Sequence, residues 1–467
     1  MRNNFVGAMG RRLSTRKPKL GLICCALGGF ALFLAASYSS PVVAQTKSRV
    51  PTVEEPAPAT AQSPIYNRVD VPAAGAVEKE FFISGTVSGG NYKTLVHVRM
   101  PKAPVRQSGI VVVEPWHPGN LWPLYAKVSE YEAREGHVAV VVVGNPLLID
   151  AILKVKNPSR YGGLSLPGKS TRTVSETPAG ETTEFEILRQ VGALIKSGKL
   201  PGVQARKVIL GGMSQTAGVV RAYIAFEHEG SDVKSTYDGY FPEQAAKSSY
   251  DKPLPDLDVP VVEMEGEREL LVLHMHGLAP APYERPDGPL YRLYEVPGMP
   301  HVATRGRPEG GGASCSGHTR TDFPTFAVYS AVLNNMIAWV DKGTPAPHVS
   351  RIVRNASGRE IIRDPSGNAG GGYRTSYLDV PIATYHATWG SYYIQSDGTP
   401  SDAEAARCDK MGWVEPLPQD QLHKLYSSHD DYFAKVTKSL DGLVAQGMIL
   451  REDANELREE ARLARIP

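Results

Sequence analysis

Ser214 stands where an apolar, strand-like run gives way to a helix-like run, in the stretch VILGGMSQTAGVV at 208–220. Gly212 precedes it by two positions, which allows the sharp turn that lifts a serine hydroxyl clear of a sheet edge. Such a turn also leaves the N–H of Gln215 placed to bind an oxyanion. Thr216 occupies the position where the common Gly-x-Ser-x-Gly pattern has its second glycine. The stretch therefore predicts a nucleophilic serine, with a plainly capped helix N-terminus as the alternative.

A serine hydroxyl becomes a good nucleophile when an imidazole takes its proton and a carboxylate orients that imidazole. Enzymes that use this turn have the acid after a later strand and the histidine after the last strand. The apolar run VPVVEME is followed by Gly266 and then Glu269, and the last such run, YRLYEV, is followed by a turn that carries His301. We therefore predict Ser214 as nucleophile, His301 as base and Glu269 as acid.

Four glutamates in the segment EMEGERE are candidates for the acid. Glu263 and Glu265 are predicted to lie within the strand and to be structural. Glu267 and Glu269 are predicted to lie in the loop that follows. We assign the acid to Glu269, which stands three residues after the glycine, and expect Glu267 to bond to loop backbone or to face solvent. Asp287 is the next alternative.

The loop after the first parallel strand ordinarily supplies a second N–H to an oxyanion. In this chain the loop is 115–118, and the backbone of Trp116 or His117 is the expected donor. Three aromatic residues near this loop could line a pocket for an acyl or aromatic group, or could be ordinary core. They are Trp116, Trp122 and Tyr125.

His274 and His276 in LHMHGL could suggest a metal pair. No acidic residue or third histidine stands beside them at a recognisable ligand spacing, so we favour a structural role. The predicted chemistry requires neither a metal ion nor an organic cofactor.

The elements that must position these residues alternate along the chain. Helix-like segments separate the apolar runs, and in one of them Thr183 and Glu186 are spaced as a capping box. This alternation predicts an α/β fold with a mainly parallel central sheet and helices on both faces. A hairpin is expected at 79–100, and a long loop at 146–178 that shapes the binding site. The apolar runs are at 109–116, 137–145, 206–212, 259–265 and 291–298.

The composition of the 467-residue chain, 42% hydrophobic and 21% charged, is that of a globular protein. Residues 1–44 differ, with six basic residues, an apolar run at 20–36, and Val42 and Ala44 at small-residue positions. They predict a secretory signal peptide cleaved after Ala44, with a retained membrane anchor as the alternative. Cleavage changes the formal net charge from +2 to −4. We therefore expect a periplasmic or secreted protein that binds neither nucleic acid nor, once cleaved, the membrane.

Residues 45–75 are rich in proline and alanine and predict a flexible lead-in. Residues 76–467 are predicted to form one domain, which includes a helical segment at 410–467 with two helices packed on the core. Two cysteines, Cys315 and Cys408, remain after cleavage. They could form a disulfide in an oxidising compartment or be two separate buried thiols.

Several segments resemble those of the bacterial α/β-hydrolase domain family, many of whose members are exported. They are FFISGTV, VVVEPWHPGN, RYGGLSLPG, GGMSQTAGVVRAYI, RPDGPLYRLYEVPGMPH and LYSSHDDYFAKVTKSLDGLVAQGMILREDANEL, and the resemblance runs from about residue 68 to the end. It implies an α/β-hydrolase fold and hydrolase chemistry, with Ser214 as nucleophile and His301 as base. The family usually has Glu-x-Asp at the acid position, where this chain has Glu267-Arg268-Glu269.

The combined prediction is an exported serine hydrolase that cleaves a carboxylic ester, small or polymeric, through an acyl-enzyme. The alternatives are an amidase or peptidase on the same scaffold, and a catalytically silent binding protein, because a fold does not by itself imply a function. A dehalogenase is disfavoured because its nucleophile would be an aspartate.

Overall fold

The compact unit Ser48–Pro467 of the computed structural model contains all the elements described below. The predicted leader at 1–44 lies outside the described residues, as do Trp122, His276, Cys408 and the side chains of His274 and Cys315. The residues that the structure describes are 50–57, 76–102, 106–117, 123–168, 178–228, 236–245, 252–275, 284–302, 314–315, 318–388 and 410–466.

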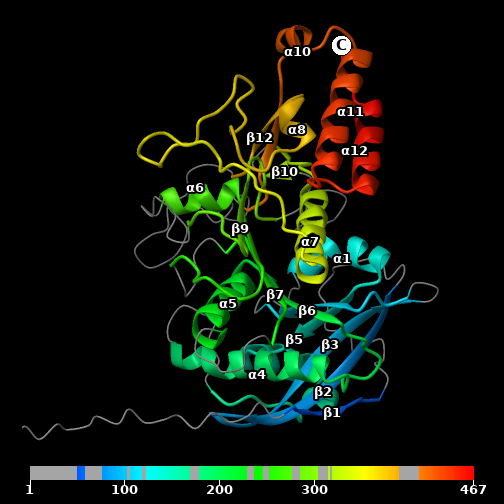
Figure 1. Cartoon of the computed structure of the whole chain (residues 1–467), viewed down its shortest axis with the longest axis vertical. Coiled ribbons are helices and arrows are strands. Elements are labelled where there is room, and N and C mark those ends of the chain that lie inside the picture. The colour runs from blue at the N-terminus through cyan, green and yellow to red at the C-terminus, as the bar shows by residue number, and fades with distance from the viewer. Residues whose placement is uncertain are drawn as a thin grey trace, which may run out of the picture. The chain divides into compact units, whose positions relative to one another are not determined.

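A nine-stranded sheet in the order β1-β2-β3-β5-β4-β6-β7-β8-β9 forms the centre of this unit (Figure 1). At one edge, β1 (Thr52–Glu54), β2 (Ala76–Val87) and β3 (Gly90–Pro101) are antiparallel, and β3 pairs antiparallel with β5. The other strands are parallel to one another. They are β5 (Val138–Val142), β4 (Ile110–Pro115), β6 (Lys207–Met213), β7 (Gly239–Glu243), β8 (Val261–Gly266) and β9 (Tyr291–Val296).

The predicted α/β fold is confirmed, since each of the five apolar runs forms a strand of the parallel part and the hairpin pairs β2 with β3. The sequence did not predict β7 or a second, four-stranded sheet in the order β10-β11-β13-β12. It also did not predict β1, which pairs with β2 and lies in the segment 45–75 expected to be a flexible lead-in. The second sheet consists of β10 (Ser314–Cys315), β11 (His318–Arg320), β13 (Trp413–Pro416) and β12 (Ala383–His386).

Helices cover both faces of the large sheet because the side chains of each strand alternate between them. Along β5, Val138 and Val140 pack in a cluster with residues of α4 and α5, whereas Ala139 and Val141 pack on the face that α1 covers. α7 lies beside α1 on that second face and contacts β7 and β8. The four helices are α1 (Pro123–Glu135), α4 (Pro178–Lys196), α5 (Gln215–Tyr223) and α7 (Thr325–Lys342).

The capping box predicted at Thr183 is wrong, because α4 already begins at Pro178 and Thr183 lies inside it. Glu186 instead accepts hydrogen bonds from the N–H and the hydroxyl of Ser88, in the turn of the β2–β3 hairpin. α5 continues directly into a π-helical turn, Ile224–His228.

The long loop predicted at 146–178 is also partly wrong. Leu148, Ile149 and Leu153 are buried in the cluster that contains Phe82 of β2, and burying these side chains orders the segment as helical turns. The turns are the π-helix Leu148–Leu153, α2 (Lys154–Lys156) and α3 (Pro158–Tyr161). Residues 169–177 of this segment lie outside the described residues.

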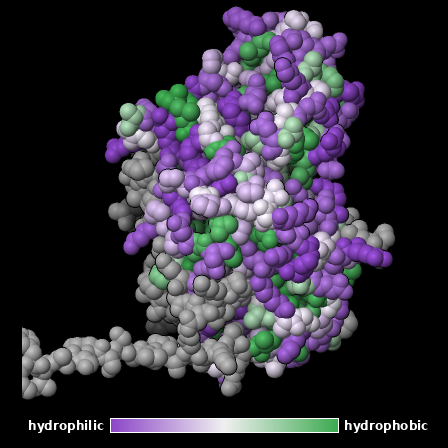
Figure 2. All heavy atoms as spheres, viewed as in Figure 1, coloured by the Kyte–Doolittle hydropathy of each residue, from purple (hydrophilic) through white to green (hydrophobic). Residues whose placement is uncertain are grey.

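The C-terminal helices pack on the core, as predicted. Leu440 and Leu457 belong to the same buried cluster as the α7 residues, and Asn335 of α7 donates a hydrogen bond to the Gly447 carbonyl at 2.8 Å. Hydrophilic side chains predominate over α11 and α12 on the face shown in Figure 2. The helices are α10 (Gln419–Leu425), α11 (His429–Ala445) and α12 (Arg451–Leu463). In the described part of the chain, no helix combines the length and apolarity that a membrane span needs.

Candidate active site

Ser214 lies in the turn between β6 and α5, with φ 61° and ψ −124°. Among the described residues, one other non-glycine residue, Gln244, has a positive φ. The Ser214 N–H donates to the backbone oxygen of Glu243 at 2.9 Å, which ties the turn to the end of β7. Backbone strain of this kind persists only where the surrounding structure holds it, and it is frequent at reactive residues.

Two neighbours of Ser214 allow the sharp turn. A Cβ atom on Gly212 would lie 2.6 Å from the Thr216 backbone oxygen, so a glycine is needed where α5 approaches β6. The Thr216 hydroxyl bonds to both the N–H and the carbonyl of Met213. A threonine therefore closes this turn at the position where the common pattern has a glycine.

The structure brings Ser214, His301 and Glu269 into one hydrogen-bonded chain. The Nε2 atom of His301 lies 2.9 Å from the Ser214 Oγ, and its Nδ1 lies 2.6 Å from the Glu269 Oε1. His301 follows β9, and Glu269 lies in α6 (Glu267–Met275), which follows β8. The carboxyl ends of three parallel strands thus deliver the three side chains to one place.

Burial and mutual charge set the ionisation of the pair. Burial lowers the pKa of His301 below its usual value, although the Glu269 carboxylate acts in the opposite direction. Burial alone would raise the pKa of Glu269, but the His301 charge and hydrogen bond, Arg268 and Gln244 together hold it below its usual value. Near neutral pH the imidazole is therefore neutral and the carboxylate is ionised. This is the state in which Nδ1 donates to Glu269 and Nε2 can accept from the serine hydroxyl.

Glu267 has partners other than His301. Its Oε2 accepts from the Gly298 N–H and its Oε1 from Arg363, both at 2.7 Å. The expected bond to loop backbone is present, but Glu267 is fully buried and does not face solvent. The predicted loop is also wrong, because α6 begins at Glu267 and both glutamates lie in its first turn.

The remaining acidic candidates are likewise engaged elsewhere. Glu263 and Glu265 lie in β8, as predicted, and both are buried. Glu263 pairs with Arg221 and accepts from the Tyr291 hydroxyl. Asp287 pairs at 2.9 Å with Arg351 and with His348. The structure therefore places Glu269 alone of these five acids in hydrogen-bond contact with His301.

The backbone N–H groups expected to bind the oxyanion are those of Gln215 and of Trp116 or His117. The Trp116 N–H donates to the Val142 carbonyl at 2.8 Å and extends the sheet, so it is not the second donor. Gln215 is the first residue of α5, where backbone N–H groups point out of the helix end. Burial, with smaller contributions from the charges of His301 and Lys410, lowers the pKa of His117 to about 4.

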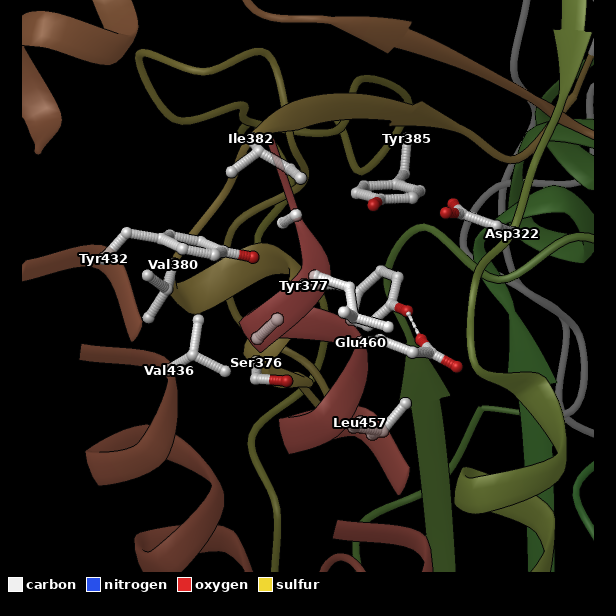
Figure 3. Close-up of a pocket in the computed structure, with 13 residues that line it drawn as sticks. Asp322, Ser376, Tyr377, Val380, Ile382, Tyr385, Tyr432, Val436, Leu457 and Glu460 are labelled. Carbon is white, nitrogen blue, oxygen red and sulfur yellow. Dashed lines mark hydrogen bonds between the residues drawn. The ribbon is translucent and has the colours of Figure 1, made fainter. Parts of the chain in front are cut away.

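The two described aromatic residues near this loop are core residues. Trp116 and Tyr125 are buried in one cluster beside β3 and β5. A separate cavity of about 470 Å³ lies among α8 (Ser376–Asp379), β12, α11 and α12, and Figure 3 shows Tyr377 donating a hydrogen bond to Glu460 in its wall. Ser214, His301 and Glu269 are not among its lining residues.

Sequence reasoning missed Gln244, which donates a hydrogen bond to the Glu269 Oε2 at 2.9 Å. It follows β7, a strand that the sequence did not reveal, so no signal placed it near the acid. Among the described residues, no group of three or more histidine, cysteine, aspartate or glutamate side chains is arranged to hold a metal ion.

A family model described as an alpha/beta hydrolase domain matches residues 44–459. No curated protein matches the sequence. Among solved structures, this chain is similar to brefeldin A esterase, a bacterial homologue of human hormone sensitive lipase, with 13% identity and a TM-score of 0.28. The match covers 43% of this chain and 64% of the esterase, which is just under two thirds of the esterase's length. A CE15 glucuronoyl esterase from Teredinibacter turnerae is 12% identical over 52% of this chain and 76% of its own, with a TM-score of 0.28. A dienelactone hydrolase from Anabaena variabilis is 16% identical over 47% of this chain and 85% of its own, with a TM-score of 0.29.

Proposed function

The chain belongs to the alpha/beta hydrolase domain family, and we propose that it is a serine hydrolase that cleaves carboxylic esters through an acyl-enzyme. One observation carries the proposal: His301 joins the Ser214 hydroxyl to the Glu269 carboxylate, at 2.9 and 2.6 Å. A nucleophile, a base and an orienting acid in hydrogen-bond contact are what acyl transfer through serine requires. The strained turn at Ser214, whose side chain is partly exposed, supports the same assignment.

In the first half of the reaction, the Ser214 Oγ attacks the ester carbonyl while the His301 Nε2 takes the hydroxyl proton. The imidazolium that forms donates through Nδ1 to Glu269, whose negative charge stabilises it. The tetrahedral intermediate collapses when His301 returns the proton to the leaving alkoxide, and the alcohol departs. In the second half, water attacks the acyl-enzyme while His301 takes one of its protons. The second tetrahedral intermediate collapses as His301 returns this proton to the Ser214 Oγ, which releases the acid product.

The negative oxygen of the tetrahedral intermediate needs hydrogen-bond donors. We assign one donor to the backbone N–H of Gln215, which directly follows the nucleophile at the start of α5. The positive end of the α5 helix dipole favours a negative charge at the same position. We place the second donor at the backbone N–H of His117, the residue after Trp116, because the Trp116 N–H is engaged in the sheet.

Ester hydrolysis is tested with 4-nitrophenyl esters of increasing acyl length, assayed beside matched anilides. We expect wild-type protein to hydrolyse at least the activated esters and the Ser214→Ala variant to lose this turnover, with a nearly unchanged melting temperature. Equal turnover by the Ser214→Ala variant would contradict the nucleophile. Hydrolysis of anilides but not of esters would replace the esterase with an amidase, and absence of both would indicate a silent binding protein.

We also propose that the protein is exported, because residues 1–44 combine a basic start, an apolar run and small residues before Ala44. N-terminal sequencing of the protein recovered from a bacterial expression host tests this directly. A mature chain that begins at Gln45 in the periplasm or the medium is the expected result. An intact leader on protein in the cytoplasm or the membrane fraction would contradict it.

A further inference from the structure

Gln244 directly follows β7 and is fully buried, with φ 52°. A positive φ is costly for a residue with a side chain, and it persists when the surrounding contacts fix it. The Gln244 N–H donates to the Met264 carbonyl of β8 at 2.7 Å, which holds the strained backbone against the neighbouring strand. This strained position aims the side chain at the acid of the candidate site.

The Gln244 amide is bonded at both of its ends. Its Nε2 donates to the Glu269 Oε2 at 2.9 Å and to the Pro300 carbonyl at 3.0 Å. Its Oε1 accepts from the Tyr329 hydroxyl of α7 at 2.7 Å. A primary amide has two N–H donors, so both are used, and the tyrosine fixes which end faces the acid.

These bonds restrain the acid and the base at the same time. The Glu269 Oε1 faces His301, whereas Oε2 faces Gln244, so the carboxylate is held from both sides. Pro300 immediately precedes His301 in the chain. One amide group therefore fixes both the rotation of the carboxylate and the backbone that carries the imidazole.

The chain leaves room for this contact at Gly266. A Cβ atom there would lie 2.7 Å from the Glu269 Oε2 and 2.9 Å from the Gln244 Nε2. Any larger residue would push the two side chains apart. Three features thus serve one hydrogen bond: the strained backbone of Gln244, the glycine that ends β8, and the hydroxyl of Tyr329.

We propose that Gln244 is a positioning residue that holds the Glu269 carboxylate in register with His301. This inference rests on the proposed function, since it assigns a role within the same site. Gln244 does not contact the reacting atoms. It acts through Glu269, by keeping the carboxylate ionised and aligned when the imidazole gains its proton during the reaction.

Gln190 provides a matched control. It too is buried, it accepts from the Tyr92 hydroxyl at 2.9 Å, and its Nε2 donates to the Thr86 carbonyl at 2.8 Å. Gln244 differs from it by the additional bond to Glu269. The Gln190→Met and Gln244→Met variants therefore lose similar structural bonds, and only the second loses a donor to the acid.

We expect the Gln244→Met variant to lower kcat for an activated ester about 10- to 100-fold, as for a lost hydrogen bond to a charged group, with KM within about twofold. The Gln190→Met variant should keep the wild-type kcat, while its melting temperature should fall about as far as that of Gln244→Met. In a Glu269→Gln background, Gln244→Met should add a much smaller loss, because the charged carboxylate through which it acts is gone and only the bond to the Pro300 carbonyl remains to be lost. Wild-type kcat in Gln244→Met, or the same fractional loss in both backgrounds, would overturn the proposal.

The Gln244→Glu variant has nearly the same shape and tests the proposal even if the methionine variant does not fold. The groups bonded to the Gln244 side chain are Glu269, the Tyr329 hydroxyl and the Pro300 carbonyl. Arg268 lies beside Glu269 at 3.3 Å, and Glu265 of β8 accepts from the N–H of the adjacent Ala245 at 3.1 Å. Two carboxyl groups in contact cannot easily both ionise. The carboxyl group introduced at position 244 should therefore donate to Glu269 only while the introduced group is protonated. We expect the ratio of its kcat to that of the wild type to fall as the pH rises. A ratio that is independent of pH would overturn the role of Gln244 as a donor.

A measurement without turnover separates this proposal from the proposed function. The proton between the His301 Nδ1 and Glu269 should give a far-downfield proton NMR resonance in wild-type and Gln190→Met protein. If no ester or amide is hydrolysed, the proposed function fails, and this resonance still decides the role of Gln244. Its loss or broadening in Gln244→Met supports the role, and an unchanged resonance overturns it.

Discussion

The Thr216 hydroxyl forms two hydrogen bonds with the backbone of Met213, one to the N–H and one to the carbonyl, each at 2.9 Å. Both residues are buried, so the hydroxyl satisfies two polar groups that water does not reach. These bonds close the turn that carries Ser214. In the common Gly-x-Ser-x-Gly pattern, a glycine at this position gives the backbone its freedom to turn. Here the Thr216 side chain stabilises the turn instead.

Replacing Thr216 with valine removes the hydroxyl and keeps the shape. The buried backbone groups of Met213 then lose a partner, and the free energy of unfolding in urea should fall by about 1–3 kcal/mol. The Thr216→Ser variant retains the hydroxyl and should lose less. Equal stability of wild type and Thr216→Val would show that the two bonds do not hold the turn.

Glu269 and Glu267 should respond differently to the same substitution. Glu269→Gln removes the charge that faces His301, and kcat should fall by about three to four orders of magnitude with little change in melting temperature. Glu267→Gln instead removes the partner of Arg363 and should lower the melting temperature with a mild effect on kcat. Steady-state kinetics and thermal unfolding of both variants test the ranking, and the reverse order would transfer the acid role to Glu267.

The pH dependence of kcat/KM should follow the lowered pKa of His301. The base must be neutral to accept the serine proton, so activity should rise with pH through a midpoint below 6.5, the usual histidine value. Because Glu269 raises the pKa of His301, the Glu269→Gln variant should shift this limb to still lower pH. A wild-type midpoint above 6.5 would mean that burial does not dominate at this imidazole.

Glu114 predicts a pH dependence of stability that is independent of catalysis. Its two carboxylate oxygens accept from the N–H groups of Leu124 and Tyr125 at the start of α1, and burial raises its pKa from 4.5 to about 8. The folded state therefore binds more protons than the unfolded state between these values, and stability should fall as the pH rises through this window. The pKa of Glu132 is also raised by burial and by Glu114. Glu132 is still present in the Glu114→Gln variant, so part of the decline in stability should remain. From pH 5 to 9, the melting temperature should decline less steeply in Glu114→Gln than in the wild type. Parallel melting-temperature curves for the two proteins would contradict the assignment.

The residues that could be predicted from the sequence are those that follow visible strands. Ser214, Glu269 and His301 each come after an apolar run, and parallel strands bring their carboxyl ends together. Gln244 follows β7, whose sequence GYFPE has a glycine, a proline and no continuous apolar run. Without that strand, no reasoning from the sequence could place the glutamine beside the acid.

Two prediction errors concern the residue at which a helix begins. α6 begins directly after β8, with no connecting residue, so the first turn of a nine-residue helix occupies the segment where the sequence predicts a loop. In α4, a helix N-terminus predicted from Thr183 and Glu186 lies further along than the observed start at Pro178. Proline is favoured in the first turn of a helix, and here that signal was more informative than the capping pattern.

The central claim is that Ser214 is an activated nucleophile, and labelling with a fluorophosphonate probe tests it most directly. The probe forms a covalent bond with a serine whose hydroxyl is activated by a base, and peptide mapping by mass spectrometry identifies the modified residue. Wild-type protein should be labelled on the peptide that contains Ser214, whereas His301→Ala should react far more slowly and Ser214→Ala not at all. Wild-type protein that stays unlabelled, or that is labelled on a different serine, would contradict the account.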